Sequence, residues 1–137
     1  MKDPFNRALL AVFLLSLAAH IFTVLIYLEV INLGLGLEWY MFYEAVSYLA
    51  LGFHVVPAFC LQLLLCRTTR KRIAVIPPAL LILGVLLMTV GYFNASGWDG
   101  LGWLVLLLLC IAPAAGFLLA WAAYGGTVLY QRSRSHG

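Results

Sequence analysis

The sequence predicts an all-helical (all-α) integral membrane protein, a bundle of four transmembrane helices joined by short loops. Its composition is 65% hydrophobic and only 9% charged, with a mean hydropathy of +1.05. Soluble domains carry about 25% charged residues, and one of this length could not bury so much apolar surface in a single core. The basic residues also cluster at the N-terminus, in one short loop and at the C-terminus, with long apolar stretches between them.

The charge pattern predicts the orientation of these helices. Cytoplasmic loops of membrane proteins are rich in Lys and Arg, so both termini are expected in the cytoplasm, most simply at the plasma membrane. The basic residues are Lys2, Arg7, Arg67, Arg70, Lys71, Arg72, Arg132 and Arg134, and the acids of the opposite segments are Glu29, Glu38, Glu44 and Asp99. At the basic ends we expect contact with anionic lipid headgroups. The sequence contains no motif typical of nucleic-acid binding.

The chain is expected to form a single domain, residues 1–137, with spans at about 8–31, 42–66, 73–93 and 101–124. The first apolar run is longer than the apolar core of a signal peptide, about 7–15 residues, so we interpret it as an uncleaved helix. Prolines punctuate the other spans. Pro57 is expected to kink the second and Pro113 to bend the fourth, because proline cannot donate the helical hydrogen bond.

The beginning of the third span and the end of the fourth carry further signals. Pro77 and Pro78 fall in the first turns of the third span, where prolines are tolerated. Gly125 and Gly126 are expected to loosen the fourth helix near the inner surface, after which the tail should leave the membrane and fray. Small residues at Ala112, Gly116 and Ala120 predict a face for close helix packing or dimerisation.

Polar residues inside the spans follow one face of each of the first two helices. They fall within arcs of about 60° and about 80° at 100° per residue. The residues are Ser16, His20, Thr23 and Tyr27 in the first span, and Glu44, Ser47, His54 and Gln62 in the second. Two helices joined by a short loop are usually neighbours. His20 and His54 lie equally far from the inner ends of their spans, so we expect them at similar depth near mid-membrane.

This polar face allows three interpretations. Polar side chains can hydrogen-bond across two helices and fix their register without further chemistry, as in a structural or interaction protein. Alternatively, His20, His54 and Glu44 can form a path for a proton, cation or small solute, in a transporter, a channel or an accessory subunit. Four spans enclose little space, so a homodimer would be a natural form of such a protein. In the third interpretation, the two imidazoles are the ligands of a b-type haem.

An enzyme is not expected. The sequence has no Ser/His/Asp or Cys/His set at known spacing and no paired carboxylates. One zinc ion cannot bridge His54 and Glu44, because ten residues of helix separate them by about 15 Å. We therefore expect no catalytic residue and, haem apart, no cofactor or metal. Cys60, Cys66 and Cys110 are interpreted as small apolar residues within spans.

Overall fold

The computed structural model describes residues 3–28 and 54–135, and these residues form helices and turns with no strand. The helices are α1 (Pro4–Tyr27), α3 (Val55–Thr68), α4 (Lys71–Ala74), α5 (Ile76–Asn94), α6 (Asp99–Leu109) and α7 (Ile111–Ser135). Within these described residues, three stretches are long and apolar enough to cross a membrane: Pro4–Ile26, Lys71–Asn94 and Asp99–Ser135. The shorter apolar helix α3 follows residues 29–53, which lie outside the described part. The predicted all-helical class is thus confirmed, and these helices indicate an integral membrane protein.

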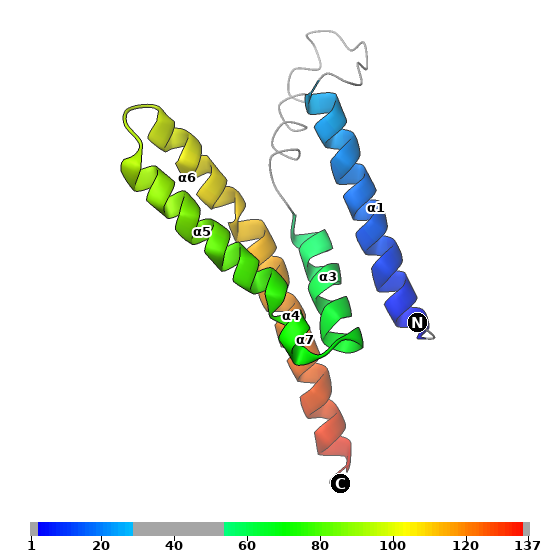
Figure 1. Ribbon diagram of the computed structural model, residues 1–137. Coiled ribbons are helices and arrows are strands. Elements are labelled where there is room, and N and C mark those ends of the chain that lie inside the picture. Colours follow the sequence, from blue (N-terminus) through cyan, green and yellow to red (C-terminus); the bar gives the residue numbers. More distant parts are fainter. Residues whose placement is uncertain (1–2, 29–53, 136–137) are drawn as a thin grey trace.

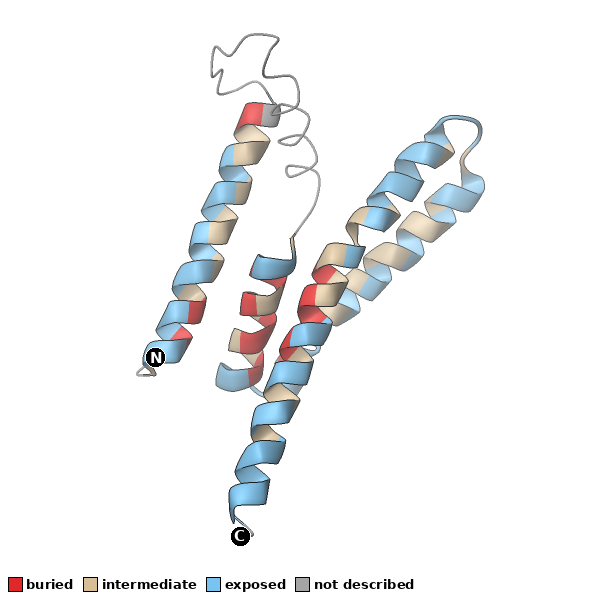
Figure 2. Cartoon of the chain, turned by 180° about the vertical axis from the view of Figure 1, so that it is seen from behind, coloured by how far each residue is buried: buried red, intermediate tan, exposed pale blue. Residues whose placement is uncertain are grey.

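Helices α1, α3 and α7 pack together, while α5 and α6 form a hairpin that extends away from them (Figure 1). Buried residues concentrate on α3, on the adjoining part of α7 and on the N-terminal part of α1 (Figure 2). Neither α5 nor α6 has a buried residue. Their apolar side chains suit a lipid environment, because lipid solvates such faces without any protein partner.

The contact between α3 and α7 depends on small residues. Ala58 and Ala120 are fully buried. A Cβ atom on Gly116 would come within 2.6 Å of the Val55 carbonyl oxygen and 2.8 Å of the Ala58 Cβ. The two backbones therefore approach as closely as small residues permit. This confirms the predicted packing role of the small-residue face of the fourth span.

The prolines mark where helices begin. Pro4 is the first residue of α1, and the Oδ1 atom of Asp3 caps this helix by accepting a hydrogen bond from the Phe5 N–H at 2.9 Å. Pro77 lies in the first turn of α5, as expected, although a separate helical turn, α4, precedes it. Pro113 follows the interruption at Cys110 that divides the fourth span into α6 and α7. Pro57 lies in the first turn of α3, and the residues before His54 that would test a kink are outside the described part.

The expectation for the end of the fourth span is wrong. Helix α7 continues through Gly125 and Gly126 to Ser135, so the tail does not fray at the two glycines. A single glycine costs only about 1 kcal/mol in a helix interior. The alanines before this pair, and the leucine, glutamine and arginine residues after it, have high helix propensity and offset this cost. The helix consequently projects beyond the end of α3 (Figure 1).

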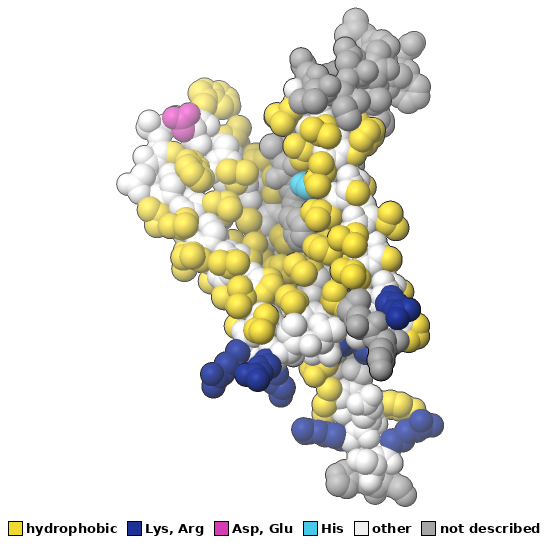
Figure 3. All heavy atoms as spheres, turned by 45° about the vertical axis from the view of Figure 1, so that its right-hand side comes forward, with side chains coloured by type: hydrophobic (Ala, Val, Ile, Leu, Met, Phe, Trp, Pro, Cys, Tyr) yellow, Lys and Arg dark blue, Asp and Glu magenta, His cyan; other side chains and the backbone are white. Residues whose placement is uncertain are grey.

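The described charges separate along the length of the molecule (Figure 3). Lys and Arg side chains lie at the end where α1 begins, α3 ends and α7 ends. Asp99 lies at the opposite end, at the start of α6. We call the first end the basic end. The carboxylate of Asp3 is also found there, and it forms an ion pair with Arg67.

Candidate functional site

The two mid-span histidines meet between α1 and α3. The ring centroids of His20 and His54 are 5.7 Å apart and the rings are nearly perpendicular, at 78°. Beside them lies a cleft of ≈ 300 Å³. Its lining consists of Ser16, Ala19, His20, Thr23, His54, Val56 and Pro57. The cleft thus combines two imidazoles and two hydroxyl side chains with apolar walls, inside the apolar part of the molecule.

Helical periodicity explains the α1 side of this cleft. Ser16, His20 and Thr23 are spaced by four and three residues, so they lie on one face of α1. The Thr23 hydroxyl donates to the carbonyl oxygen of His20 at 2.7 Å, which satisfies its proton within the helix. Its oxygen lone pairs remain the groups that it can present to a ligand.

The α3 side of the cleft is formed where that helix begins. His54 is the N-cap residue of α3, in an extended backbone conformation, and Pro57 is buried in the first turn. The first N–H groups of a helix have no partner within it, so proline loses nothing at this position. The helix start brings the His54 ring to the depth of His20.

Four of the eight residues in the predicted polar face line this cleft: Ser16, His20, Thr23 and His54. Gln62 belongs to the same predicted face but lies elsewhere. Its side chain is fully buried, and its Nε2 atom donates to the Ala74 carbonyl oxygen at 2.6 Å. Glu44 and Ser47 lie outside the described residues, and so does the side chain of Tyr27.

An apolar cluster closes the bundle between this cleft and the basic end. Its buried members come from three helices, with Leu9 on α1, Cys60 and Leu63 on α3 and Ala120 on α7. Phe13, Phe59, Leu64 and Tyr124 pack around them, half-buried. We call these eight residues the core cluster. On α1, Phe13 precedes Ser16 by one turn and Leu9 precedes it by two, so the cluster lies directly next to the cleft.

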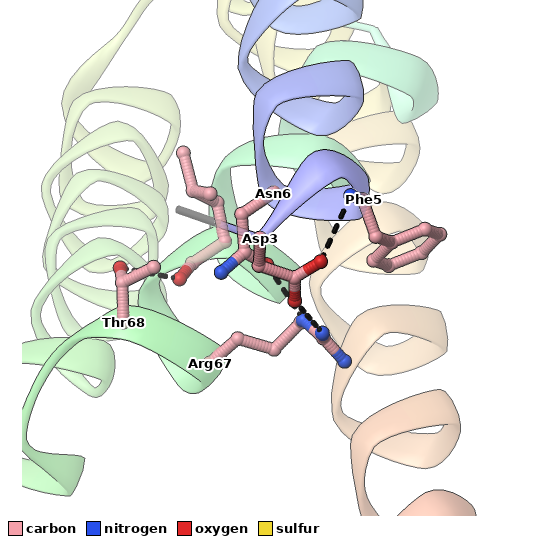
Figure 4. Close-up of polar contacts among 6 residues, drawn as sticks. Asp3, Phe5, Asn6, Arg67 and Thr68 are labelled. Atoms are coloured by element: carbon pink, nitrogen blue, oxygen red, sulfur yellow. Dashed lines mark hydrogen bonds and ion pairs between the residues drawn. The ribbon is translucent and has the colours of Figure 1, made fainter. Parts of the chain in front are cut away.

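Beyond the core cluster, Arg67 ties α3 to the start of α1 (Figure 4). Its Nε atom donates to Asn6 Oδ1 and its Nη2 atom donates to Asp3 Oδ2, both at 2.7 Å. The guanidinium carbon also lies 4.8 Å from the centre of the Phe5 ring. We call Asp3, Asn6 and Arg67 the inner clamp. The N–H of Phe5 and then Arg67 hold the pKa of Asp3 below its ordinary value of 3.8.

Sequence reasoning missed the inner clamp. It interpreted Arg67 only as a member of the basic loop, although Asp3-Pro4 is a typical helix start. A buried asparagine in the first turn of an apolar helix, such as Asn6, needs a hydrogen-bond partner. Because the predicted topology puts the start of the first span and the end of the second at the same membrane surface, Arg67 was the available partner. The sequence therefore contained a signal for the contact between Asn6 and Arg67.

A larger groove of ≈ 940 Å³ runs along the α5–α6 hairpin, at the end away from the inner clamp. Its lining is mainly apolar and includes Trp98, Asp99 and Trp103. Tryptophans of this kind are typical of the membrane–water boundary. Because its walls carry few polar groups and no titratable pair, the groove offers less chemistry than the histidine cleft.

The thiols of Cys60, Cys66 and Cys110 are free. Among the described residues, no three His, Cys, Asp or Glu side chains come together as metal ligands. No family model, curated protein or solved structure matches this chain.

Proposed function

We propose that the protein spans the membrane four times, with both termini in the cytoplasm, and that the cleft between α1 and α3 conducts or carries a proton, a small cation or a small solute. It acts alone, as a homodimer or as an accessory subunit of a membrane complex. The observation that carries the proposal is the pair His20 and His54, brought from two helices to the wall of one cleft. Histidine changes its charge near neutral pH, which suits proton exchange and ion binding.

The accessibility of the two imidazoles favours this proposal over a purely structural role. The cleft of ≈ 300 Å³ beside them is open on one side, where Ala19 and Val56 are exposed, so an ion or small solute can reach the rings. Polar groups in a membrane usually face protein or a wet cavity and mark ion or solute pathways. The volume is at the small end of ligand pockets, which favours an ion or small solute over a haem macrocycle.

The charge distribution supports the proposed orientation. Arg70, Lys71 and Arg72 are exposed on and beside α4, and Arg132 and Arg134 are exposed on the projecting part of α7. Exposed cations at a membrane surface attract anionic headgroups with about 1 kcal/mol per residue. The headgroups of the cytoplasmic leaflet are therefore the proposed partners of the basic end.

Flux through liposomes tests the proposed function. Purified protein in sealed vesicles should carry H⁺, Na⁺ or K⁺, as followed by pH-sensitive and ion-sensitive dyes. His54→Leu should abolish that flux while the protein still inserts and folds, because leucine is well solvated in lipid but cannot exchange a proton. Normal flux in folded His54→Leu protein would reject the role of this cleft, and absence of flux in the unmodified protein would reject the transport proposal for these ions.

A matched pair of threonines provides the control. Thr23 lines the cleft, whereas the Thr89 hydroxyl donates to the Val85 carbonyl oxygen of its own helix, α5, at 2.7 Å. Thr23→Val should lower flux by about tenfold, the equivalent of one hydrogen bond. Thr89→Val makes the same chemical change away from the cleft and should leave flux unchanged. Purified protein should also show no Soret absorption band, since a strong band would select the haem interpretation.

A further inference from the structure

The histidine cleft is separated from the basic end by two successive barriers on the same pair of helices. From the cleft, α1 presents Phe13 and Leu9 and then Asn6 and Asp3. Helix α3 presents Cys60 and Leu63 and then Arg67. From Ser16 to Asp3 the axial distance along α1 is about 20 Å. A solute leaving the cleft toward the basic end must therefore pass an apolar barrier and then a polar one.

The apolar barrier is closed by packing. Leu9, Cys60 and Leu63 are buried, and Phe13 packs against them from α1. A hydrated ion does not enter such a contact, since burying a charge without partners is very costly. Passage between α1 and α3 requires α1 to move away, because Leu9 and Phe13 of α1 pack against Cys60 and Leu63 of α3 within this cluster.

The polar barrier holds α1 and α3 together at their ends. Arg67 bonds the N-cap residue Asp3 and Asn6 of the first turn of α1, through two different nitrogen atoms. Asn6 is almost completely buried, so its amide needs this partner. These two hydrogen bonds join the start of α1 to the end of α3.

From this arrangement we infer that the inner clamp is a gate: its opening lets α1 separate from α3 and connects the histidine cleft with the basic end. This inference rests on the proposed function and names how that site is controlled. In the described structure the gate is closed. Arg67 and the first turn of α1 position the helices and do not bind the transported species in the cleft.

Two native cysteines report on the gate without any flux measurement. Cys60 is buried within the core cluster, whereas Cys110 lies at the junction of α6 and α7, away from α1. Alkylation by the permeant reagent N-ethylmaleimide, resolved by peptide mass spectrometry, measures how often each thiol becomes accessible. Arg67→Gln should speed the alkylation of Cys60 about fivefold, a modest value because the ion pair is partly exposed.

Arg70→Gln is the matched control, because Arg70 is an exposed arginine of the same end. It should leave both rates unchanged, and Arg67→Lys, which retains the charge, should give a rate between those of Arg67→Gln and the unmodified protein. An unchanged Cys60 rate in Arg67→Gln would overturn the gate. Parallel acceleration of Cys60 and Cys110 would also overturn it, since general loosening of the fold would then explain the result.

The flux assay separates this inference from the proposed function. Arg67→Gln should raise passive ion leak through the vesicles, and His54→Leu in the same chain should remove that leak. A leak that persists without His54 would show that the opened clamp does not lead to the cleft, which contradicts the gate. Absence of any flux in the unmodified protein would instead reject the transport proposal, whatever the Cys60 rate.

Discussion

At the scale of single residues, Gln62 replaces a hydrogen bond that a proline removes. Ala74 is fully buried, and its carbonyl oxygen would normally accept from the N–H of the residue four positions later. That residue is Pro78, which has no N–H. The Gln62 Nε2 atom donates to this oxygen at 2.6 Å instead. The glutamine is therefore required by the proline-containing start of α5 rather than by the histidine cleft.

This relation predicts coupling between Gln62 and Pro78. Gln62→Leu should lower the free energy of unfolding by about 1 kcal/mol, because the buried Ala74 carbonyl loses its donor. In a Pro78→Ala chain, the N–H of residue 78 can donate to the Ala74 carbonyl oxygen. Gln62→Leu should therefore lower the free energy of unfolding much less in that chain. Unfolding in mixed micelles measures both steps of this double-mutant cycle. If Gln62→Leu lowers the free energy of unfolding equally in the unmodified and the Pro78→Ala chains, the Gln62 amide does not replace the missing N–H of residue 78.

Asp3 predicts how the inner clamp depends on pH. The Phe5 N–H and Arg67 hold the pKa of this carboxyl below 3.8, so the folded protein favours its ionised form. A lowered pKa stabilises the fold above the ordinary pKa, and the stabilisation is lost as the pH falls through the lowered value. Asp3→Asn should therefore reduce stability at pH 7 but have no effect at the most acidic pH. Thermal unfolding of both proteins measures this difference from about pH 2 to about pH 7, a range that includes the titration of carboxyl groups.

At the scale of elements, the α3–α7 contact is the most restrictive in the described molecule. Even the single methyl group of alanine at position 116 would lie 2.6 Å from the Val55 carbonyl oxygen and 3.0 Å from the Phe59 nitrogen. Backbone atoms cannot move aside as a flexible side chain can. The helices must instead separate, and overpacking of this kind costs about 1–3 kcal/mol.

Gly116→Ala should therefore destabilise the protein by about 1–3 kcal/mol. Gly126→Ala is the matched control on the same helix, because a Cβ atom there has open space around it. It should be neutral or stabilise α7 by up to about 1 kcal/mol through higher helix propensity. Thermal unfolding of the two variants compares them directly. Similar effects at both positions would show that α7 does not pack through Gly116 in the protein studied.

At the scale of the whole molecule, the sequence predicted what depends on composition and periodicity. Long apolar stretches identified the helices, and the three- and four-residue spacing of Ser16, His20 and Thr23 identified the face that lines the cleft. Interactions across helices were less predictable. The partners of Gln62 and Arg67 depend on which way a long side chain turns at a helix end, and spacing alone does not specify this. The length of α7 was misjudged because glycine was treated as a helix end rather than as a small cost.

The proposed orientation of the molecule in its membrane rests on where the exposed charges lie, and two serines can test it. Ser96 lies between α5 and α6, beside Asp99, and Ser135 ends α7 beside Arg132 and Arg134. Both residues are exposed. Lys and Arg are retained on the cytoplasmic side of membrane proteins, so Ser96 should face the outside and Ser135 the cytoplasm.

A membrane-impermeant maleimide applied to intact cells should label the variant Ser96→Cys, and should label Ser135→Cys only after the cells are permeabilised. The unmodified protein, whose described cysteines are buried or half-buried, gives the background. Labelling of Ser135→Cys in intact cells would reverse the orientation. It would also place the inner clamp at the outer surface, so that the gate would control entry from outside rather than exit to the cytoplasm. The same labelling experiment thus fixes the direction in which the cleft is closed.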